Sequence, residues 1–137
     1  TTVNDCKLIE LPVIESERKG VLTPVYNQDH IPFDIQRVYY LYDVPAGSER
    51  GGHAHKMLEQ FIVAASGSFE MMIDDGINKR VFNLNRPSYG LYVPTMLWGV
   101  LKNFSGGGIC LVLASLPYSE VDYYRDYTEF VNDKGKK

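Results

Sequence analysis

Short runs of apolar and β-branched residues recur along the chain, and turn-forming Gly, Pro, Asp and Ser residues separate them. Such runs are typical of strands. We expect strands at 8–13, 21–25, 38–44, 60–65, 69–73, 80–84, 91–93, 98–104 and 109–114. Asp75-Gly76, between two of these runs, predicts a hairpin. Because no helical pattern lies between the strands, the chain is predicted to be all-β, as an antiparallel sandwich or barrel.

Only the end of the chain has a helical pattern. Ser119 and Asp122 follow Pro117 with the spacing of an N-terminal capping box, which predicts a helix over residues 119–131. No internal repeat or linker interrupts the sequence. We therefore expect residues 1–137 to form one domain.

Composition and charge narrow the classes of function. The formal net charge is -3, and the 14 Lys and Arg residues are scattered, so we expect no nucleic-acid partner. The longest apolar runs, near 61–65 and 109–114, are too short to span a bilayer, which predicts no membrane partner. Cys6 and Cys110 do not make a disulfide framework, and no secretory segment opens the chain. We expect a cytoplasmic protein in which Cys110 is a buried thiol.

Two histidines carry the strongest chemical signal. His53 and His55 lie one residue apart, and side chains at alternate positions of a strand point to the same face. Both imidazoles are therefore expected to enter the same space, joined by Glu59 if the strand continues in register. Such a group binds a metal ion or moves protons.

The segment from Gly47 to Gly67 resembles the first cupin motif, with its glycine, His-X-His, glutamate and glycine, and has one extra residue before the last glycine. The second cupin motif is only partly present. Pro94 and Asn103 fit it, but Gly99 stands where the fourth metal ligand of a metal cupin would lie. The chain therefore resembles a cupin that has lost part of its set of metal-ligating residues.

Four blocks narrow this resemblance to the cupin-type dTDP-sugar 3,4-ketoisomerases, which include the WxcM-like proteins. They cover residues 31–40, 53–60, 90–93 and 113–127. The resemblance implies a cupin double-stranded β-helix, which is an antiparallel β-sandwich or jelly roll, with a short C-terminal helix. It also implies a homodimer that exchanges N-terminal strands (about residues 8–25), with no required metal or other cofactor. The implied substrate is dTDP-4-keto-6-deoxyglucose, converted to a 3-keto-6-deoxyhexose for deoxyaminosugar and glycan biosynthesis.

Roles for individual residues follow from this chemistry. By resemblance, His53 and His55 are the general acid and base, and which does which stays open. The developing oxyanion needs a donor, which Tyr39, Arg37 or Arg50 supplies; Arg37 and Tyr39 share a strand face by spacing. The pyrophosphate of the substrate requires cations. Its candidates are Arg18, Lys19, Arg37, Arg50 and Lys102, of which Arg18 and Lys19 would reach a site across the dimer.

Other aromatic and acidic residues allow two interpretations. Trp98 either packs in the core or stacks on the thymine base, and Glu59 either orients a histidine or makes a structural hydrogen bond. The tyrosines of the predicted helix are expected to serve packing or an interface. They are Tyr123, Tyr124 and Tyr127.

Three rival functions remain. A metal cupin, either a dioxygenase or an isomerase, would bind iron with His53, His55 and Glu59. A 3,5-epimerase of deoxysugar synthesis shares the substrate and fold, but its Arg-Gly-X-His-X-Gln sequence has His55 in place of the glutamine here. A non-catalytic sugar-binding cupin would bind the nucleotide sugar without turning it over. The configuration of the product at C4 is left open by the sequence.

Overall fold

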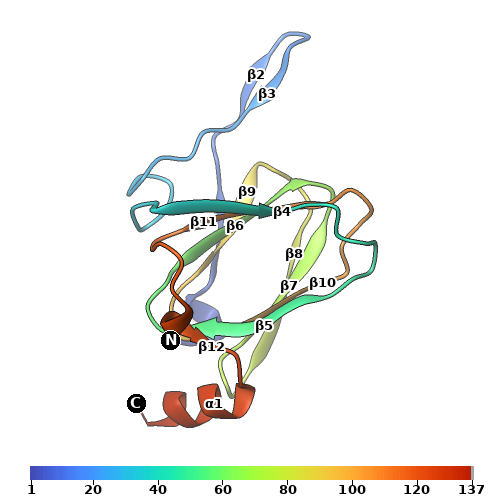
Figure 1. Ribbon diagram of the computed structural model, residues 1–137. Helices are drawn as coiled ribbons and strands as arrows, with labels where there is room; N and C mark the ends of the chain where they lie inside the picture. Colours follow the sequence, from blue (N-terminus) through green and yellow to red (C-terminus); the bar gives the residue numbers. More distant parts are fainter. Residues whose placement is uncertain (137) are drawn as a thin grey trace.

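The computed structural model describes residues 1–136 as two five-stranded antiparallel sheets that face each other (Figure 1). The first sheet has the strand order β1 (Lys7–Glu10), β9 (Tyr89–Val93), β6 (Gln60–Ser66), β11 (Ile109–Ala114) and β4 (Arg37–Leu41). The second has the order β12 (Tyr123–Tyr124), β5 (Arg50–His55), β10 (Trp98–Lys102), β7 (Phe69–Asp74) and β8 (Lys79–Leu84). From β4 onward the chain crosses repeatedly between the two sheets, which is jelly-roll connectivity. The predicted antiparallel β-sandwich is confirmed.

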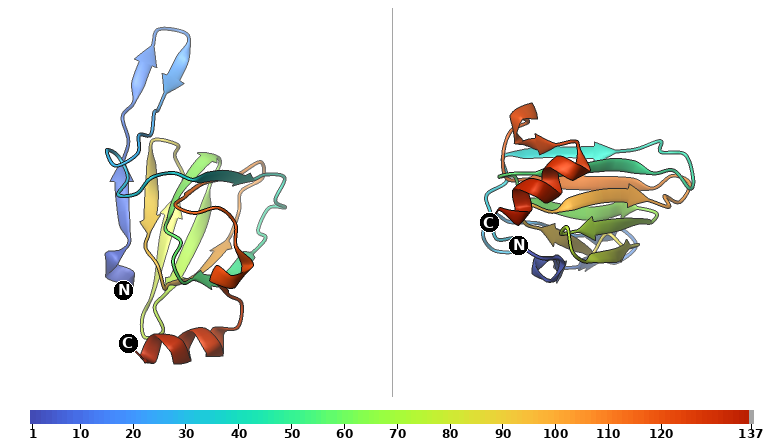
Figure 2. Two further views of the ribbon diagram at one scale, coloured as in Figure 1. Left: turned by 60° about the vertical axis from the view of Figure 1, so that its left-hand side comes forward. Right: turned by 90° about the horizontal axis from the view of Figure 1, so that it is seen from below.

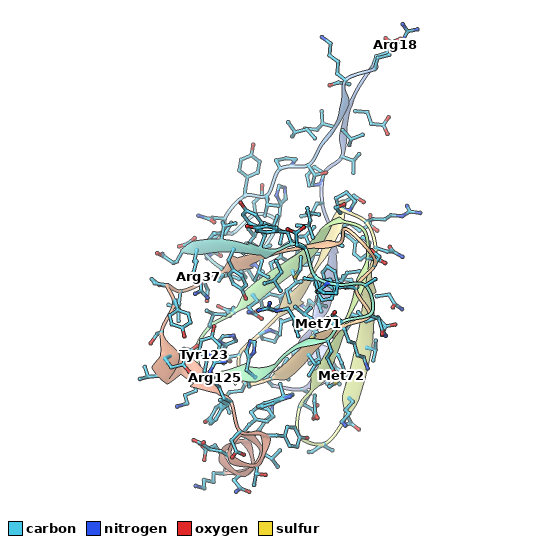
Figure 3. The ribbon with its side chains drawn as sticks, turned by 45° about the vertical axis from the view of Figure 1, so that its right-hand side comes forward. Arg18, Arg37, Met71, Met72, Tyr123 and Arg125 are labelled. Atoms are coloured by element: carbon cyan, nitrogen blue, oxygen red, sulfur yellow. The ribbon has the colours of Figure 1, made fainter. Side chains whose placement is uncertain are left out.

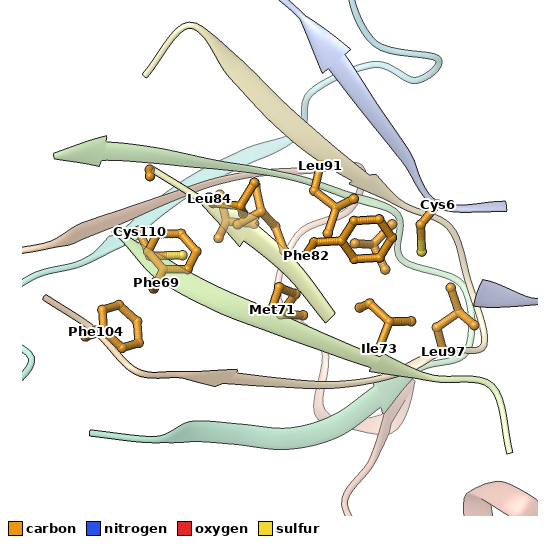
Figure 4. Close-up of a cluster of buried hydrophobic side chains, with 14 of the residues drawn as sticks. Cys6, Phe69, Met71, Ile73, Phe82, Leu84, Leu91, Leu97, Phe104 and Cys110 are labelled. Carbon is orange, nitrogen blue, oxygen red and sulfur yellow. The ribbon is translucent and has the colours of Figure 1, made fainter. Parts of the chain in front are cut away.

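The core lies between the sheets and results from the alternation of side chains along each strand (Figure 4). On β7, Phe69, Met71 and Ile73 are buried in the central cluster, and Phe69 stacks on Phe104 with ring centroids 5.1 Å apart. Each fully buried large apolar side chain contributes about 1.5–3 kcal/mol relative to exposure. Cys110 belongs to the same cluster, which confirms that its thiol is buried.

The predicted β7–β8 hairpin is also confirmed. Its turn is held by Asp75, whose Oδ1 accepts hydrogen bonds from Ile77 N (2.9 Å) and Asn78 N (2.7 Å). The other carboxylate oxygen accepts from Val3 N at 3.0 Å, in the short 3-10 helix η1 (Val3–Asp5). The turn therefore anchors the N-terminal segment as well.

A second hairpin projects from the sandwich. It is formed by β2 (Ile14–Ser16) and β3 (Gly20–Leu22) and extends well beyond the sheets (Figure 2). Its apolar side chains have no cover within the chain, since Ile14 is 52% exposed and Val21 63% exposed. The predicted strands at 8–13 and 21–25 were only partly right, because the strands observed there are Lys7–Glu10 and Gly20–Leu22. The strand assumed for His53 and His55 is β5, which begins at Arg50.

The predicted helix over residues 119–131 is wrong in its start. Ser119 makes no side-chain capping bond; it precedes the 3-10 turn η2 (Glu120–Asp122) and then β12, which pairs with β5. The helix α1 (Tyr127–Gly135) begins later because Asp126 caps it, accepting from Thr128 N and Glu129 N. The helix packs Phe130 against Trp98, beneath the second sheet (Figure 1). None of the helices in residues 1–136 has the length and apolar character needed to cross a membrane.

Candidate active site

The two histidines lie on β5 and face the space between the sheets. Their imidazole rings meet edge to face, with centroids 5.0 Å apart and planes at 85°. Ala54, between them, points to the opposite side and is buried under the C-terminal segment. The prediction that both rings enter one space is confirmed. His55 is buried at 6% exposure, whereas His53 is half-buried.

Tyr123 forms a wall over both rings. Strand β12 pairs Tyr123 with His55, so the tyrosine ring lies 4.4 Å from the His55 ring and 5.1 Å from the His53 ring. Tyr123 packs, as expected, but it packs on the histidine rings and from a strand instead of a helix. Tyr124 and Tyr127 do pack, against Phe130 and Trp98 respectively.

Burial sets the protonation state of the pair. Loss of hydration lowers the pKa of His53, and the positive charge of Arg125 lowers it further. Burial also lowers the pKa of His55, to about 4, with the neighbouring His53 as the next cause and Asp122 opposing it. Both imidazoles are therefore neutral near neutral pH and have a free lone pair to accept a proton.

A cavity of about 420 Å³ opens in front of His53, between the two sheets. Its inner wall is apolar, with Ile62 and Met71 among the lining residues, and Figure 3 shows Met71 pointing into this space. Its polar lining comes from four segments, namely β4, β5, β6 and the C-terminal segment. These side chains are Arg37, Tyr39, Arg50, His53, Gln60, Tyr118, Tyr123 and Arg125. Cavities of this size are typical of small-molecule sites.

Arg37 and Tyr39 reach the cavity from alternate positions of β4, as predicted. Arg37 Nε and Nη2 are buried and have no hydrogen-bond partner among the described residues. Its guanidinium carbon lies 4.9 Å from the Tyr39 ring centre, a cation–π distance. A buried guanidinium with free donors is suited to binding an anion in this cavity.

Tyr39 is arranged as a hydrogen-bond donor. Gln60 Nε2 donates to the Tyr39 hydroxyl oxygen at 3.0 Å, which leaves the hydroxyl hydrogen free for a group in the cavity. Burial raises the pKa of Tyr39 to about 12, so the phenol keeps its proton. Gln60 was not predicted as a site residue, because a neutral amide gives no charge or titratable signal in the sequence.

The outer rim of the cavity comes from the C-terminal segment. Arg125 binds Glu120 with two hydrogen bonds, of 2.6 Å from Nε and 2.9 Å from Nη2, and its guanidinium carbon lies 4.3 Å from the Tyr123 ring centre. Tyr118 donates to the same carboxylate and also lines the cavity. These rim residues were missed because the segment was expected to be helical, although it lies in one of the four family-like blocks.

Glu59 does not join the histidines. The chain turns at residues 56–58 and then enters β6, which belongs to the opposite sheet. Alternation along β6 directs Gln60 into the cavity and Glu59 to the other face, where Tyr92 donates a hydrogen bond to it. The expected grouping of Glu59 with His53 and His55 is therefore wrong.

The remaining candidates fall into two groups. Arg50 lines the cavity, as expected. Trp98 is buried at 8% exposure and packs against Phe130 of α1, so of its two interpretations core packing is the one observed. Lys102 follows the cavity-lining Leu101 on β10 and is not among the lining residues. Arg18, like Lys19, lies at the turn of the projecting hairpin, far from the cavity of its own chain (Figure 3).

The residues present do not fit a cupin metal site. The two histidines lack a third ligand, because Glu59 faces away and Gly99 offers no side-chain donor. Across the described part of the chain, no three His, Cys, Asp or Glu residues are grouped as metal ligands would be.

The family model described as WxcM-like, C-terminal (FdtA) matches residues 4–135. A TDP-4-oxo-6-deoxy-alpha-D-glucose-3,4-oxoisomerase from Aneurinibacillus thermoaerophilus is 40% identical over 114 residues, which cover 83% of this chain and 82% of that protein. The WlaRB TDP-quinovose 3,4-ketoisomerase from Campylobacter jejuni is 42% identical, with a TM-score of 0.90 over 95% of this chain and 99% of that chain. A His-to-Asn variant of the 3,4-ketoisomerase QdtA from Thermoanaerobacterium thermosaccharolyticum, solved with TDP-4-keto-6-deoxyglucose, is 35% identical. Its TM-score is 0.94, over 98% of this chain and 97% of that chain.

The family match extends over almost the whole chain, including both sheets and the C-terminal segment that completes the cavity. The chain therefore belongs to the WxcM-like, C-terminal (FdtA) family of sugar 3,4-ketoisomerases.

Proposed function

We propose that this protein is a sugar-nucleotide 3,4-ketoisomerase that converts TDP-4-keto-6-deoxyglucose to a TDP-3-keto-6-deoxyhexose. The observation that carries the proposal is the edge-to-face pair of His53 and His55, of which His53 lines a cavity that also holds the unpartnered Arg37 guanidinium. Family relatives with 40–42% identity are named for this reaction class. The product would serve deoxyaminosugar and glycan biosynthesis.

The reaction moves a carbonyl between neighbouring carbons and is balanced by proton transfers alone. The histidine pair takes the C3 proton, and the C3–H electron pair becomes a C3–C4 double bond as negative charge moves to O4. The O3 hydroxyl proton then passes to O4 while C3 becomes the carbonyl carbon. The histidine pair returns its proton to C4. Neutral imidazoles suit the first step because a protonated ring accepts no proton.

Tyr39 is the candidate donor to the developing oxyanion. Its hydroxyl oxygen is already occupied by the Gln60 amide, so its hydrogen is directed elsewhere. A donor that is fixed before the reaction stabilises charge on O4 without reorganising in the transition state. The high pKa of the buried phenol keeps this hydrogen in place across the working pH range.

Arg37 and Arg50 are the candidate ligands of the pyrophosphate. Both line the cavity, and the free donors of Arg37 match the paired oxygens of a phosphate. Glu120 already occupies two donors of Arg125 at the rim, so Arg125 has less capacity for the substrate.

A homodimer is part of the proposal. The β2–β3 hairpin exposes Val21 at 63% and Leu22 at 58%. An isolated two-stranded hairpin is only marginally stable in water, and exposed apolar surface of this kind marks an interaction site. The outer face of β4 exposes Val38 at 54% and Tyr40 at 59%. Exchange of N-terminal hairpins would cover such surfaces and would carry Arg18 and Lys19 toward the partner's cavity. Sedimentation velocity tests this, because a monomer at micromolar concentration would exclude the exchange.

The cytoplasm is the proposed location. Cys6 and Cys110 are both free and buried in the core. Unpaired thiols are common where glutathione keeps the compartment reducing.

Product identification by NMR tests the proposed reaction. The protein is incubated with TDP-4-keto-6-deoxyglucose in D₂O, and a 3-keto sugar that retains its proton at C5 is expected. A 3,5-epimerase would instead leave the carbonyl at C4 and place deuterium at C5. Recovery of unchanged substrate would favour a protein that only binds the nucleotide sugar.

A further inference from the structure

Asp122 lies behind the histidine pair and takes no part in the steps above. Its Oδ2 is 3.3 Å from His55 Nδ1, and the two side chains are only 10% and 7% exposed. We infer that His53 alone touches the sugar, and that His55 and Asp122 are positioning residues that stabilise the substrate proton while His53 holds it. This inference rests on the proposed function and assigns the separate roles of the two histidines within it.

The cavities distinguish the two rings. His53 lines the cavity of about 420 Å³, whereas His55 does not. His55 lines a separate inner cavity of about 20 Å³, which His53 and Gln60 share. A water molecule needs about 10–15 Å³ of such volume, so the inner cavity is large enough for one water and far too small for a sugar. The substrate therefore reaches His53, and His55 acts from behind.

Asp122 is fixed in place by the backbone. Its Oδ1 accepts from Met57 N at 2.7 Å and its Oδ2 from Leu58 N at 3.2 Å, while Lys56 N donates to its carbonyl oxygen at 2.9 Å. Among the described residues, His55 is the basic side chain within ion-pair distance of this carboxylate. The negative charge of Asp122 is therefore held beside the His55 ring and is not paired with a lysine or arginine.

The charged side chains around the two rings act on their pKa values in opposite directions. Arg37 and the neighbouring ring both lower the pKa of His55, and Arg125 lowers the pKa of His53. Asp122 raises the pKa of His55, as Glu120 raises that of His53. The other elements packed on the pair contribute uncharged side chains. They include Gln60 of β6, Met71 of β7 and Tyr123 of β12, whose ring packs on both imidazoles, whereas Gly99 of β10 presents only its backbone.

The proton balance gives Asp122 a defined effect. When His53 takes the C3 proton, the pair becomes a monocation in a buried site with two arginines nearby. With its proton on Nδ1, the nitrogen that lies 3.3 Å from Asp122 Oδ2, His55 presents its Nε2 lone pair to the protonated His53, directly or through one water. The proton then returns from His53 to C4, and neither His55 nor Asp122 changes its net charge over the cycle.

Asp122→Asn tests the inference, with Asp126→Asn as the matched control. Asp126 also accepts two backbone amide bonds, from Thr128 N at 2.8 Å and Glu129 N at 3.2 Å, but it caps α1 away from the histidines. We expect Asp122→Asn to lower kcat about 10–100-fold, as loss of a carboxylate that supports a histidine does elsewhere, with KM and TDP affinity unchanged. Asp126→Asn should keep the wild-type kcat.

A pH titration of the ring nitrogens of His55 by NMR separates an electrostatic role from a structural one. Loss of the carboxylate should lower the pKa of His55 further, and wild-type His55 should carry its proton on Nδ1. Mere loosening would rehydrate the ring and raise its pKa, because burial is the largest cause of the lowering.

An upward shift, a proton on Nε2 in the wild type, or an unchanged kcat would each overturn the inference. If the wild-type protein fails to convert the substrate, the proposed function fails, while the titration still decides whether Asp122 and His55 are paired.

Discussion

The guanidinium carbon of Arg37 lies 4.9 Å from the ring centre of Tyr39, two residues further along β4. This contact holds a cation and a phenol side by side at one wall of the cavity. Because the two groups are expected to meet different parts of the substrate, their substitutions should give different kinetic effects.

Tyr39→Phe should lower kcat about 10²–10³-fold, with little change in TDP affinity, because it removes one oxyanion donor. Tyr40→Phe is the matched control, since Tyr40 is the next residue on β4 but is 59% exposed on the opposite face. Steady-state kinetics of both variants check this. An equal loss in the two variants, or a kcat for Tyr39→Phe close to wild type, would exclude Tyr39 as the donor.

Arg37→Lys should act mainly on binding. A lysine keeps the charge but not the fork of donors, and hydrogen bonds to charged groups contribute about 1.5–3 kcal/mol, so TDP affinity should fall about 10–100-fold. Arg80→Lys is the control, because Arg80 stacks on Phe82 in the second sheet and does not line the cavity. Calorimetric titration with TDP makes the comparison. Unaltered affinity in Arg37→Lys would show that the pyrophosphate binds elsewhere.

Glu59→Gln should leave kcat close to wild type. The amide retains an oxygen to accept from Tyr92, and the side chain lies on the face of β6 opposite the cavity. A metal-dependent enzyme that used His53, His55 and Glu59 would instead lose its metal and its activity. Activity and metal content of the purified variant therefore test the geometry, and a loss of more than tenfold in kcat would contradict it.

Activity should persist below the ordinary pKa of histidine. The pKa of both rings is lowered by burial from 6.5, that of His55 to about 4, so the base form survives as the pH falls through 6.5. Folding stability should follow a different course. Below about pH 6.5 the histidine rings bind protons in the unfolded chain but stay neutral in the folded chain. The free energy of unfolding should therefore fall as the pH is lowered from about 6.5 toward 4. Profiles of kcat/KM and chemical unfolding against pH check both; an activity midpoint at 6.5 would contradict the lowered pKa values.

Local patterns were sufficient to predict much of the fold. The Asp75-Gly76 turn and the flanking alternation give β7 and β8 without reference to distant residues, because a hairpin is a local structure. The C-terminal helix shows the limit of such patterns. The sequence predicts Ser119 as the cap, but the helix is capped by Asp126, because residues 123–124 pair with β5, a contact between segments far apart in the sequence.

The site was predictable where a single strand determines it. Alternation along β5 and β4 places His53 with His55 and Arg37 with Tyr39. Glu59 was misplaced because the chain changes sheets after residue 55, and this reverses the expected parity. Asp122 was predicted in a capping box and not beside His55, because its approach to His55 depends on the register of β12, which local patterns do not encode.

Loss of the C3 proton of TDP-4-keto-6-deoxyglucose tests the central claim most directly. Its rate is followed by NMR in D₂O for the wild type, His53→Asn and His55→Asn, with TDP affinity and the circular dichroism spectrum as checks on folding. We expect rapid loss in the wild type and rates about 10²–10⁴-fold lower in both variants, the range of general acid–base groups. Wild-type rates in both folded variants would contradict the account.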